Sequence, residues 1–142
     1  MIKTFRGLLA DGTQDRIRLS TLKGKVGYRI TKFEVMHDEP GQQHVEGTMK
    51  IYKTSQSTID NNVDFSDPNL LAAAYLAESD DHANTIGMVT IFDSEIFNQD
   101  IYVTLEDTVG SRPMNYYIEI EVQELSDMQA EYTTIKDIRS NS

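Results

Sequence analysis

Apolar and polar residues alternate along most of the chain, which is the pattern of strands that bury one face. In the clearest run, Tyr116, Ile118, Ile120 and Val122 share one parity, and mostly charged or polar side chains share the other. The chain contains eight such runs, separated by turn residues: 2–9, 15–19, 26–37, 45–54, 71–78, 85–93, 100–106 and 115–125. The pattern predicts a single all-β domain, a jelly-roll-like β-sandwich of about eight antiparallel strands.

One predicted strand changes parity along its length. Tyr28 and Ile30 lie on one face of the run 26–37, whereas Phe33 and Val35 need the opposite parity to reach the same face. An extra residue near Thr31 would restore the phase, since a β-bulge places two residues opposite one. The sequence therefore predicts a bulge at this position.

The N-terminal runs are basic and the rest of the chain is acidic. Residues 1–30 carry seven basic and two acidic side chains, whereas residues 31–142 carry six basic and 21 acidic ones, for a net charge of −10. Asp11-Gly12 is a turn signal, so we expect the runs 2–9 and 15–19 to form a basic hairpin. Two interpretations remain open, a solvated acidic surface and a head-to-tail contact between basic and acidic ends of neighbouring subunits. The candidate basic contact residues are Arg6, Arg16, Arg18, Lys23 and Lys25.

The C-terminal segment has a different pattern. Met128, Tyr132, Ile135 and Ile138 fall at helical spacing, although Thr133 to Ile135 also reads as extended. We expect a β-sandwich domain over 1–126 and a C-terminal arm or short helix over 127–142. The arm either binds a neighbouring protein, with Tyr132, Ile135 and Ile138 as contacts, or closes over its own sandwich.

The sequence contains only weak signals of a catalytic, metal-binding or cofactor-binding site. The chain has no cysteine, and the spacing of His37, His44 and His82 matches no zinc motif. The acidic loops lack calcium-loop spacing, and the sequence contains neither a GxSxG elbow nor a phosphate-binding loop. We therefore expect a protein that is not an enzyme, with no catalytic residue, metal or cofactor.

The charge and hydropathy of the chain also limit the classes of partner that we expect it to bind. An acidic surface repels nucleic-acid phosphates, so we expect no direct nucleic-acid binding. No apolar run approaches the roughly 20 residues that span a bilayer, so we expect no membrane contact. Tyr52, Tyr102 and Tyr117 take the polar parity of their strands. Exposed tyrosines of this kind are typical of protein interfaces or of sugar-binding faces.

Several segments resemble small β-rich virion proteins of marine-type tailed bacteriophages. They are MIKTFRGLLADGTQDRIRLST, NQDIYVTLED, MNYYIEIEV and MQAEYTTIKDIRSNS. The resemblance implies an accessory subunit of the capsid or tail, made in the host cytoplasm and located in the virion. No defined motif accompanies this resemblance, so the resemblance identifies no functional residue in the chain.

The combined prediction is a non-enzymatic structural subunit that decorates or cements a capsid in many copies and contacts other virion proteins. Weak contacts of this kind gain strength from avidity. Two alternatives remain: a tail or connector subunit, and a carbohydrate-binding sandwich module.

Overall fold

The computed structural model describes the whole chain except residues 23, 42–43, 79–86 and 140–142. The described residues form eight strands and one helix, so the all-β prediction is confirmed. The elements are β1 (Ile2–Leu9), β2 (Gln14–Ile17), β3 (Val26–His37), β4 (Val45–Tyr52), β5 (Leu70–Glu78), β6 (Gly87–Phe92), β7 (Ile101–Asp107), β8 (Met114–Glu124) and α1 (Asp127–Arg139). Within these residues, no helix is long and apolar enough to cross a bilayer.

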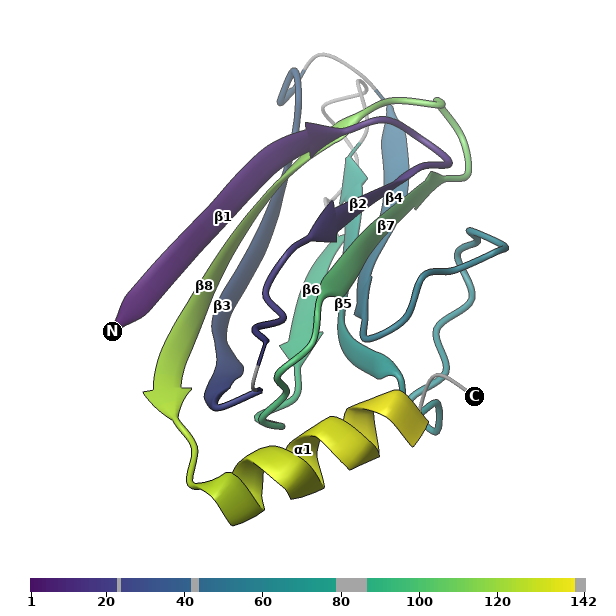
Figure 1. Cartoon of the computed structure of the whole chain (residues 1–142). Coiled ribbons are helices and arrows are strands. Elements are labelled where there is room, and N and C mark those ends of the chain that lie inside the picture. Colours follow the sequence, from purple (N-terminus) through teal and green to yellow (C-terminus); the bar gives the residue numbers. More distant parts are fainter. Residues whose placement is uncertain (23, 42–43, 79–86, 140–142) are drawn as a thin grey trace.

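The strands form two antiparallel sheets packed as a sandwich (Figure 1). The three-stranded sheet has the order β1-β8-β3, and the five-stranded sheet has the order β2-β7-β4-β5-β6. β1 pairs with β8, β2 with β7 and β4 with β5, so the pairs run from the two ends of the chain toward its middle, as in a jelly roll. β6 pairs with β5 and not with β3, so these two strands are both edge strands.

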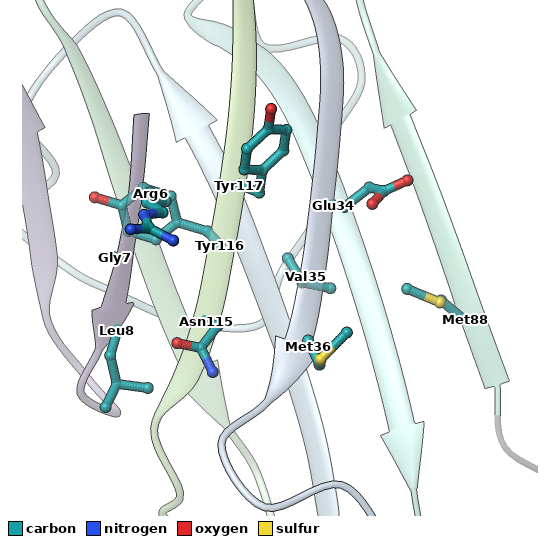
Figure 2. A pocket seen from close by; sticks show the side chains of 10 residues that line it. All are labelled: Arg6, Gly7, Leu8, Glu34, Val35, Met36, Met88, Asn115, Tyr116 and Tyr117. Carbon is teal, nitrogen blue, oxygen red and sulfur yellow. The ribbon is translucent and has the colours of Figure 1, made fainter. Parts of the chain in front are cut away.

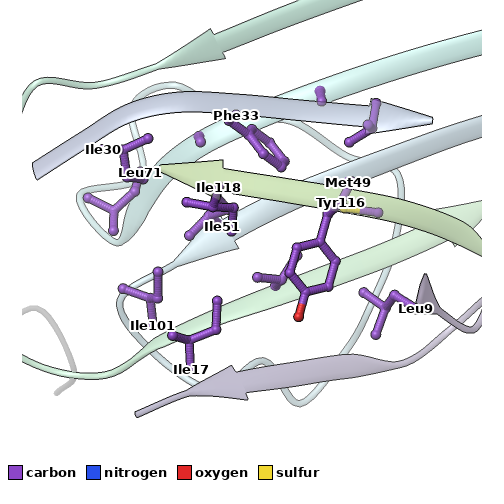
Figure 3. Close-up of a cluster of buried hydrophobic side chains, with 14 of the residues drawn as sticks. Leu9, Ile17, Ile30, Phe33, Met49, Ile51, Leu71, Ile101, Tyr116 and Ile118 are labelled. Carbon is purple, nitrogen blue, oxygen red and sulfur yellow. The ribbon is translucent and has the colours of Figure 1, made fainter. Parts of the chain in front are cut away.

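Alternating side chains of both sheets fill the space between them (Figure 3). Ile118 and Ile120 of β8 are fully buried, as are Met49 and Ile51 of β4. The predicted inward parity of β8 is therefore confirmed. Burial of each such side chain stabilises the fold by about 1.5–3 kcal/mol.

The predicted bulge in β3 is confirmed. The register of β3 against β8 shifts between Ile30 and Lys32, which leaves Thr31 as the extra residue. Ile30 before the shift and Phe33 after it are both buried. The bulge therefore lets one long strand keep its apolar side chains in the core although their parity changes.

The predicted N-terminal hairpin is wrong. β1 pairs with β8 in the three-stranded sheet, and β2 pairs with β7 in the five-stranded sheet. The turn at Asp11-Gly12 exists, with Gly12 at a φ of 73°, but it carries the chain from one sheet to the other. Leu9 and Ile17 both reach the core, so the two strands bury apolar side chains from different sheets.

β4 is buried on both faces, which corrects one prediction about the tyrosines. The loop after β4 covers the outer face of the strand, where Lys50 Nζ donates to Asp60 Oδ1 at 3.0 Å and to the carbonyl of Asn62 at 2.6 Å. Tyr52 lies on the same face and is only 7% exposed, although its parity predicted a surface position. Tyr102 and Tyr117 are half-buried.

Candidate functional site

The helix α1 begins at a well-defined cap. The N–H of Gln129 donates to Ser126 Oγ at 3.2 Å, and the N–H of Ser126 donates to Gln129 Oε1 at 3.0 Å. This reciprocal pair is a capping box, which satisfies two N–H groups that a helix start otherwise leaves unpaired. The cap sets the direction of the helix immediately after β8.

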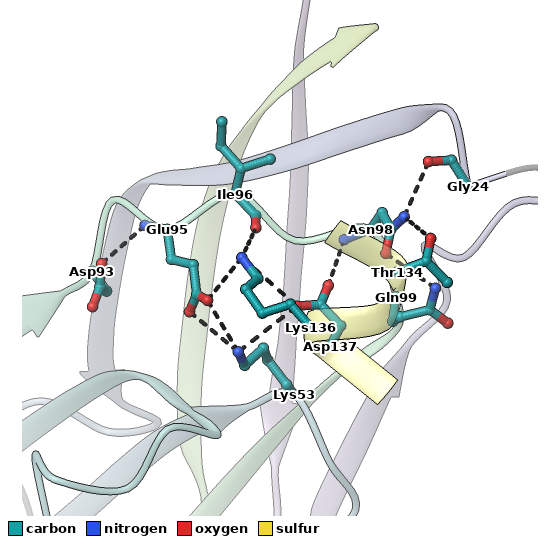
Figure 4. Close-up of polar contacts among 10 residues, drawn as sticks. All are labelled: Gly24, Lys53, Asp93, Glu95, Ile96, Asn98, Gln99, Thr134, Lys136 and Asp137. Atoms are coloured by element: carbon teal, nitrogen blue, oxygen red, sulfur yellow. Dashed lines mark hydrogen bonds and ion pairs between the residues drawn. The ribbon is translucent and has the colours of Figure 1, made fainter. Parts of the chain in front are cut away.

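The side of α1 that faces the sandwich is mostly polar. Ala130, Thr133 and Asp137 are its buried side chains. The loop before β7 holds this side: the N–H of Asn98 donates to Asp137 Oδ2 at 2.9 Å, and Asn98 Nδ2 donates to Thr134 Oγ1 at 2.6 Å (Figure 4). Hydrogen bonds, more than apolar packing, therefore attach α1 to the sheets.

A charged cluster completes this attachment (Figure 4). The side chain of Lys53 is 3% exposed, and its Nζ lies 3.1 Å from Glu95 Oε1 and 3.7 Å from Asp137 Oδ1. Lys136 Nζ lies 2.9 Å from the same Glu95 oxygen. Burial raises the pKa of Asp137, and the N–H of Asn98 and the two lysines oppose that rise only in part.

The opposite side of α1 is apolar and faces solvent. The exposed fractions are 81% for Met128, 70% for Tyr132, 52% for Ile135 and 54% for Ile138. A surface helix ordinarily turns its apolar stripe toward the core, so α1 has the reverse orientation. An exposed apolar patch of this kind is typical of a surface that binds another protein. We call these four residues the outer face of α1.

The structure separates the predicted contact residues into several places. Tyr132, Ile135 and Ile138 lie together on the outer face of α1. Arg6 lies on the outer surface of the three-stranded sheet, whereas Arg16 belongs to the five-stranded sheet. Arg18 is exposed just after β2. The backbone carbonyl of Lys25 accepts the N–H of Leu125, next to α1. Lys23 lies outside the described residues.

Arg16 takes part in a structural ion pair. Its Nε donates to Asp100 Oδ2 at 2.7 Å, and Asp100 Oδ1 accepts the N–H groups of Leu19 and Ser20. Burial by itself would raise the pKa of Asp100, but these hydrogen bonds and that of Ser20 Oγ outweigh it and lower the pKa to about 2. The charge of Arg16 is therefore already compensated within the molecule.

A groove lies over the outer surface of the three-stranded sheet (Figure 2). It has a volume of about 630 Å³, and its lining includes Arg6, Glu34, Asn115 and Tyr117. The hydroxyl of Tyr117 donates to Glu119 Oε1 at 2.8 Å. An aromatic ring beside charged and amide groups is an arrangement that can bind a sugar.

Metal-binding groups do not gather in the described part of the chain. No group of three or more His, Asp or Glu side chains there is placed to hold an ion. His37 is buried, and its Nδ1 accepts the N–H of Glu39 at 2.9 Å, whereas His44 is exposed. His82 lies outside the described residues.

Sequence reasoning missed the polar attachment of α1 and the exposed apolar residues of β6. A signal for the attachment existed, since Thr133, Thr134 and Asp137 share the helix side opposite the apolar stripe. Asn98 and Lys53 carry no such signal, because they meet the helix only in the folded chain.

Comparison with known proteins assigns no relative: no protein-family pattern and no curated protein matches the chain.

Proposed function

We propose that the chain is a non-enzymatic structural subunit that attaches to neighbouring proteins of a particle through the outer face of α1. The observation that supports this proposal most strongly is that the polar side of α1 is buried while its apolar side is exposed. The exposed apolar residues are Met128, Tyr132, Ile135 and Ile138. Exposing this apolar surface is costly in water, and burial in a partner would recover about 25 cal/mol per Å². The resemblance to phage virion proteins supports a capsid-decorating or cementing subunit.

The partner has a definite chemistry in this proposal. Residues 31–142 carry 21 acidic and six basic side chains, and Glu131 lies exposed among the apolar residues of α1. The best complement is a protein surface with an apolar groove rimmed by Lys or Arg. Such a rim would speed encounter with an acidic subunit, and the groove would hold the helix.

The test uses substitutions on the outer face in the full chain. Y132K/I135K places two charges on the apolar face, and we expect the fold to remain intact because both side chains are more than half exposed. We expect at least a tenfold loss of the subunit from purified particles, quantified by mass spectrometry. A full deletion of α1 is less clean, because it would uncover Lys53 and Asn98.

The matched control is V109K, an apolar-to-lysine change in the turn between β7 and β8, at the opposite end of the sandwich from α1 (Figure 1). Its occupancy on particles should equal that of the wild type. Equal occupancy of Y132K/I135K would overturn the proposal.

The groove of Figure 2 favours a second candidate, carbohydrate binding. Tyr117 supplies a half-buried ring, and Arg6, Glu34 and Asn115 supply hydrogen-bonding groups around it. A glycan array tests this candidate: the wild type should bind a defined glycan set that Y117A loses. Absence of binding to every glycan by the wild type would reject it.

A further inference from the structure

The exposed edges of the two sheets differ in how they are protected. Edge strands present unpaired N–H and C=O groups, and proteins ordinarily limit unwanted pairing there with charges or bulges. In the described structure, the edge strand β1 carries Lys3 and Arg6, and the edge strand β2 carries Asp15 and Arg16. The edge strand β3 has the bulge at Thr31 and charged residues beyond it.

β6 lacks all of these protections. Its sequence, GMVTIF, contains no charge and no proline, and its register against β5 has no bulge. Met88 and Val89 are both 53% exposed, Ile91 is 49% exposed and Phe92 is 39% exposed. β6 is therefore an uncharged edge with apolar side chains on both faces, which is typical of a strand that pairs with another chain.

We propose that β6 pairs antiparallel with β6 of a second copy of this chain, which joins two five-stranded sheets into one. A two-fold axis midway between the Thr90 residues of the two copies places Val89 opposite Ile91 of the other copy and Met88 opposite Phe92. Thr–Thr, β-branched and sulfur–aromatic pairs are all favourable across strands. In this register the two copies of β6 are complementary to each other, and no side chain of one copy of β6 lies opposite a charged side chain of the other.

Charge limits where a second copy can approach this chain. Two copies that each carry a net charge of −10 repel each other over most of their surface. β6 provides a contact without any charged side chain, so this edge is where two identical acidic molecules can approach. The repulsion elsewhere predicts that added salt strengthens the dimer, because salt screens it.

The outer surface next to β6 extends the contact. Val89 and Ile91 border a hollow that also contains Tyr75, Val63 and Phe65, all of which are exposed. Pairing across the two-fold axis brings the hollows of both copies to the same side of the joined sheet. A contact through one six-residue strand is smaller than a standard interface, so the dimer should form reversibly with concentration.

The experiment measures the mass of the full chain by analytical ultracentrifugation over a concentration series. We expect the wild type to shift from monomer to dimer, and V89K/I91K to stay monomeric because each introduced lysine faces another lysine. V89K/I91E should dimerise, because each introduced lysine faces a glutamate of the other copy. Substitutions at these half-exposed positions should leave the circular dichroism spectrum unchanged.

The matched control is I2K, an apolar-to-lysine change on the exposed part of β1, which should dimerise like the wild type. A wild type that stays monomeric at every concentration, or a V89K/I91K variant that still dimerises, overturns the proposal. A monomeric V89K/I91E variant overturns the register. The inference is independent of the outer face of α1, since Y132K/I135K should retain the dimer.

Discussion

The N–H of Asn98 donates to Asp137 Oδ2 at 2.9 Å, and both residues are fully buried. This bond joins the loop before β7 to the last turn of α1, 39 residues further along the chain. It holds the polar side of the helix against the sandwich, and in doing so it turns the apolar side outward. The exposed apolar face is therefore a consequence of how the helix is attached.

Replacing Asp137 with alanine should lower the free energy of unfolding by about 1–3 kcal/mol, because the N–H of Asn98 would be buried without an acceptor. Asp137→Asn keeps an acceptor oxygen and should lose less. Urea denaturation followed by circular dichroism measures both. Glu131→Ala, on the exposed side of the same helix, should stay within about 0.5 kcal/mol of the wild type. Equal stability of Asp137→Ala and the wild type would contradict this role.

Acid should destabilise the protein through Asp100. Hydrogen bonds to the carboxylate hold its folded-state pKa at about 2, below its ordinary value of 3.8. A lowered pKa stabilises the fold above pH 3.8, and that contribution is lost as the pH falls from about 4 to about 2. Denaturation at a series of pH values should show this fall. In Asp100→Asn the fall should be smaller, and an unchanged fall would assign it to other groups.

The capping box predicts the cost of removing the Ser126 hydroxyl. Ser126→Ala should lower the free energy of unfolding by about 1 kcal/mol, because the N–H of Gln129 loses its acceptor. Thermal denaturation measures the change. Ser57→Ala, at an exposed loop serine, serves as the control and should have no measurable effect. Loss of stability in both variants to the same degree would argue against a capping role.

Close packing inside the sandwich makes Gly47 sensitive to substitution. A Cβ at this position would collide with Met114 Sδ, and Met114 is fully buried. Gly47→Ala should therefore cost about 1–3 kcal/mol from overpacking. Met114→Ala should cost about 2–5 kcal/mol through the cavity it leaves. The double variant should cost less than the sum of the two, by at least about 0.5 kcal/mol, since the added methyl then enters vacant space. Additive costs would refute the collision.

Two patterns in the sequence correctly predicted local structure. The parity change between Ile30 and Phe33 predicted the bulge in β3, because strand side chains alternate strictly and a single extra residue is the simplest correction. The spacing of Met128, Tyr132, Ile135 and Ile138 identified the helix face that lies exposed. The spacing alone did not say whether this face turns inward or outward.

Other residues were placed wrongly for one common reason. Tyr52 has outward parity but is buried, because the loop after β4 folds back over its strand. Arg6 and Arg16 flank one turn but belong to different sheets, because β1 and β2 pair with strands about a hundred residues away. The local alternation of apolar and polar residues does not specify where a loop folds or which strands pair with each other.

The sequence by itself determined the all-β class, most of the inward-facing side chains and the amphipathic character of the last segment. These properties follow from the two-residue period of strands and the 3.6-residue period of helices, which are local. Only the tertiary structure decided which strands are edges and which side of α1 faces solvent. Those outcomes depend on contacts such as Asn98 with Asp137 and Lys53 with Glu95, between residues that lie far apart along the chain.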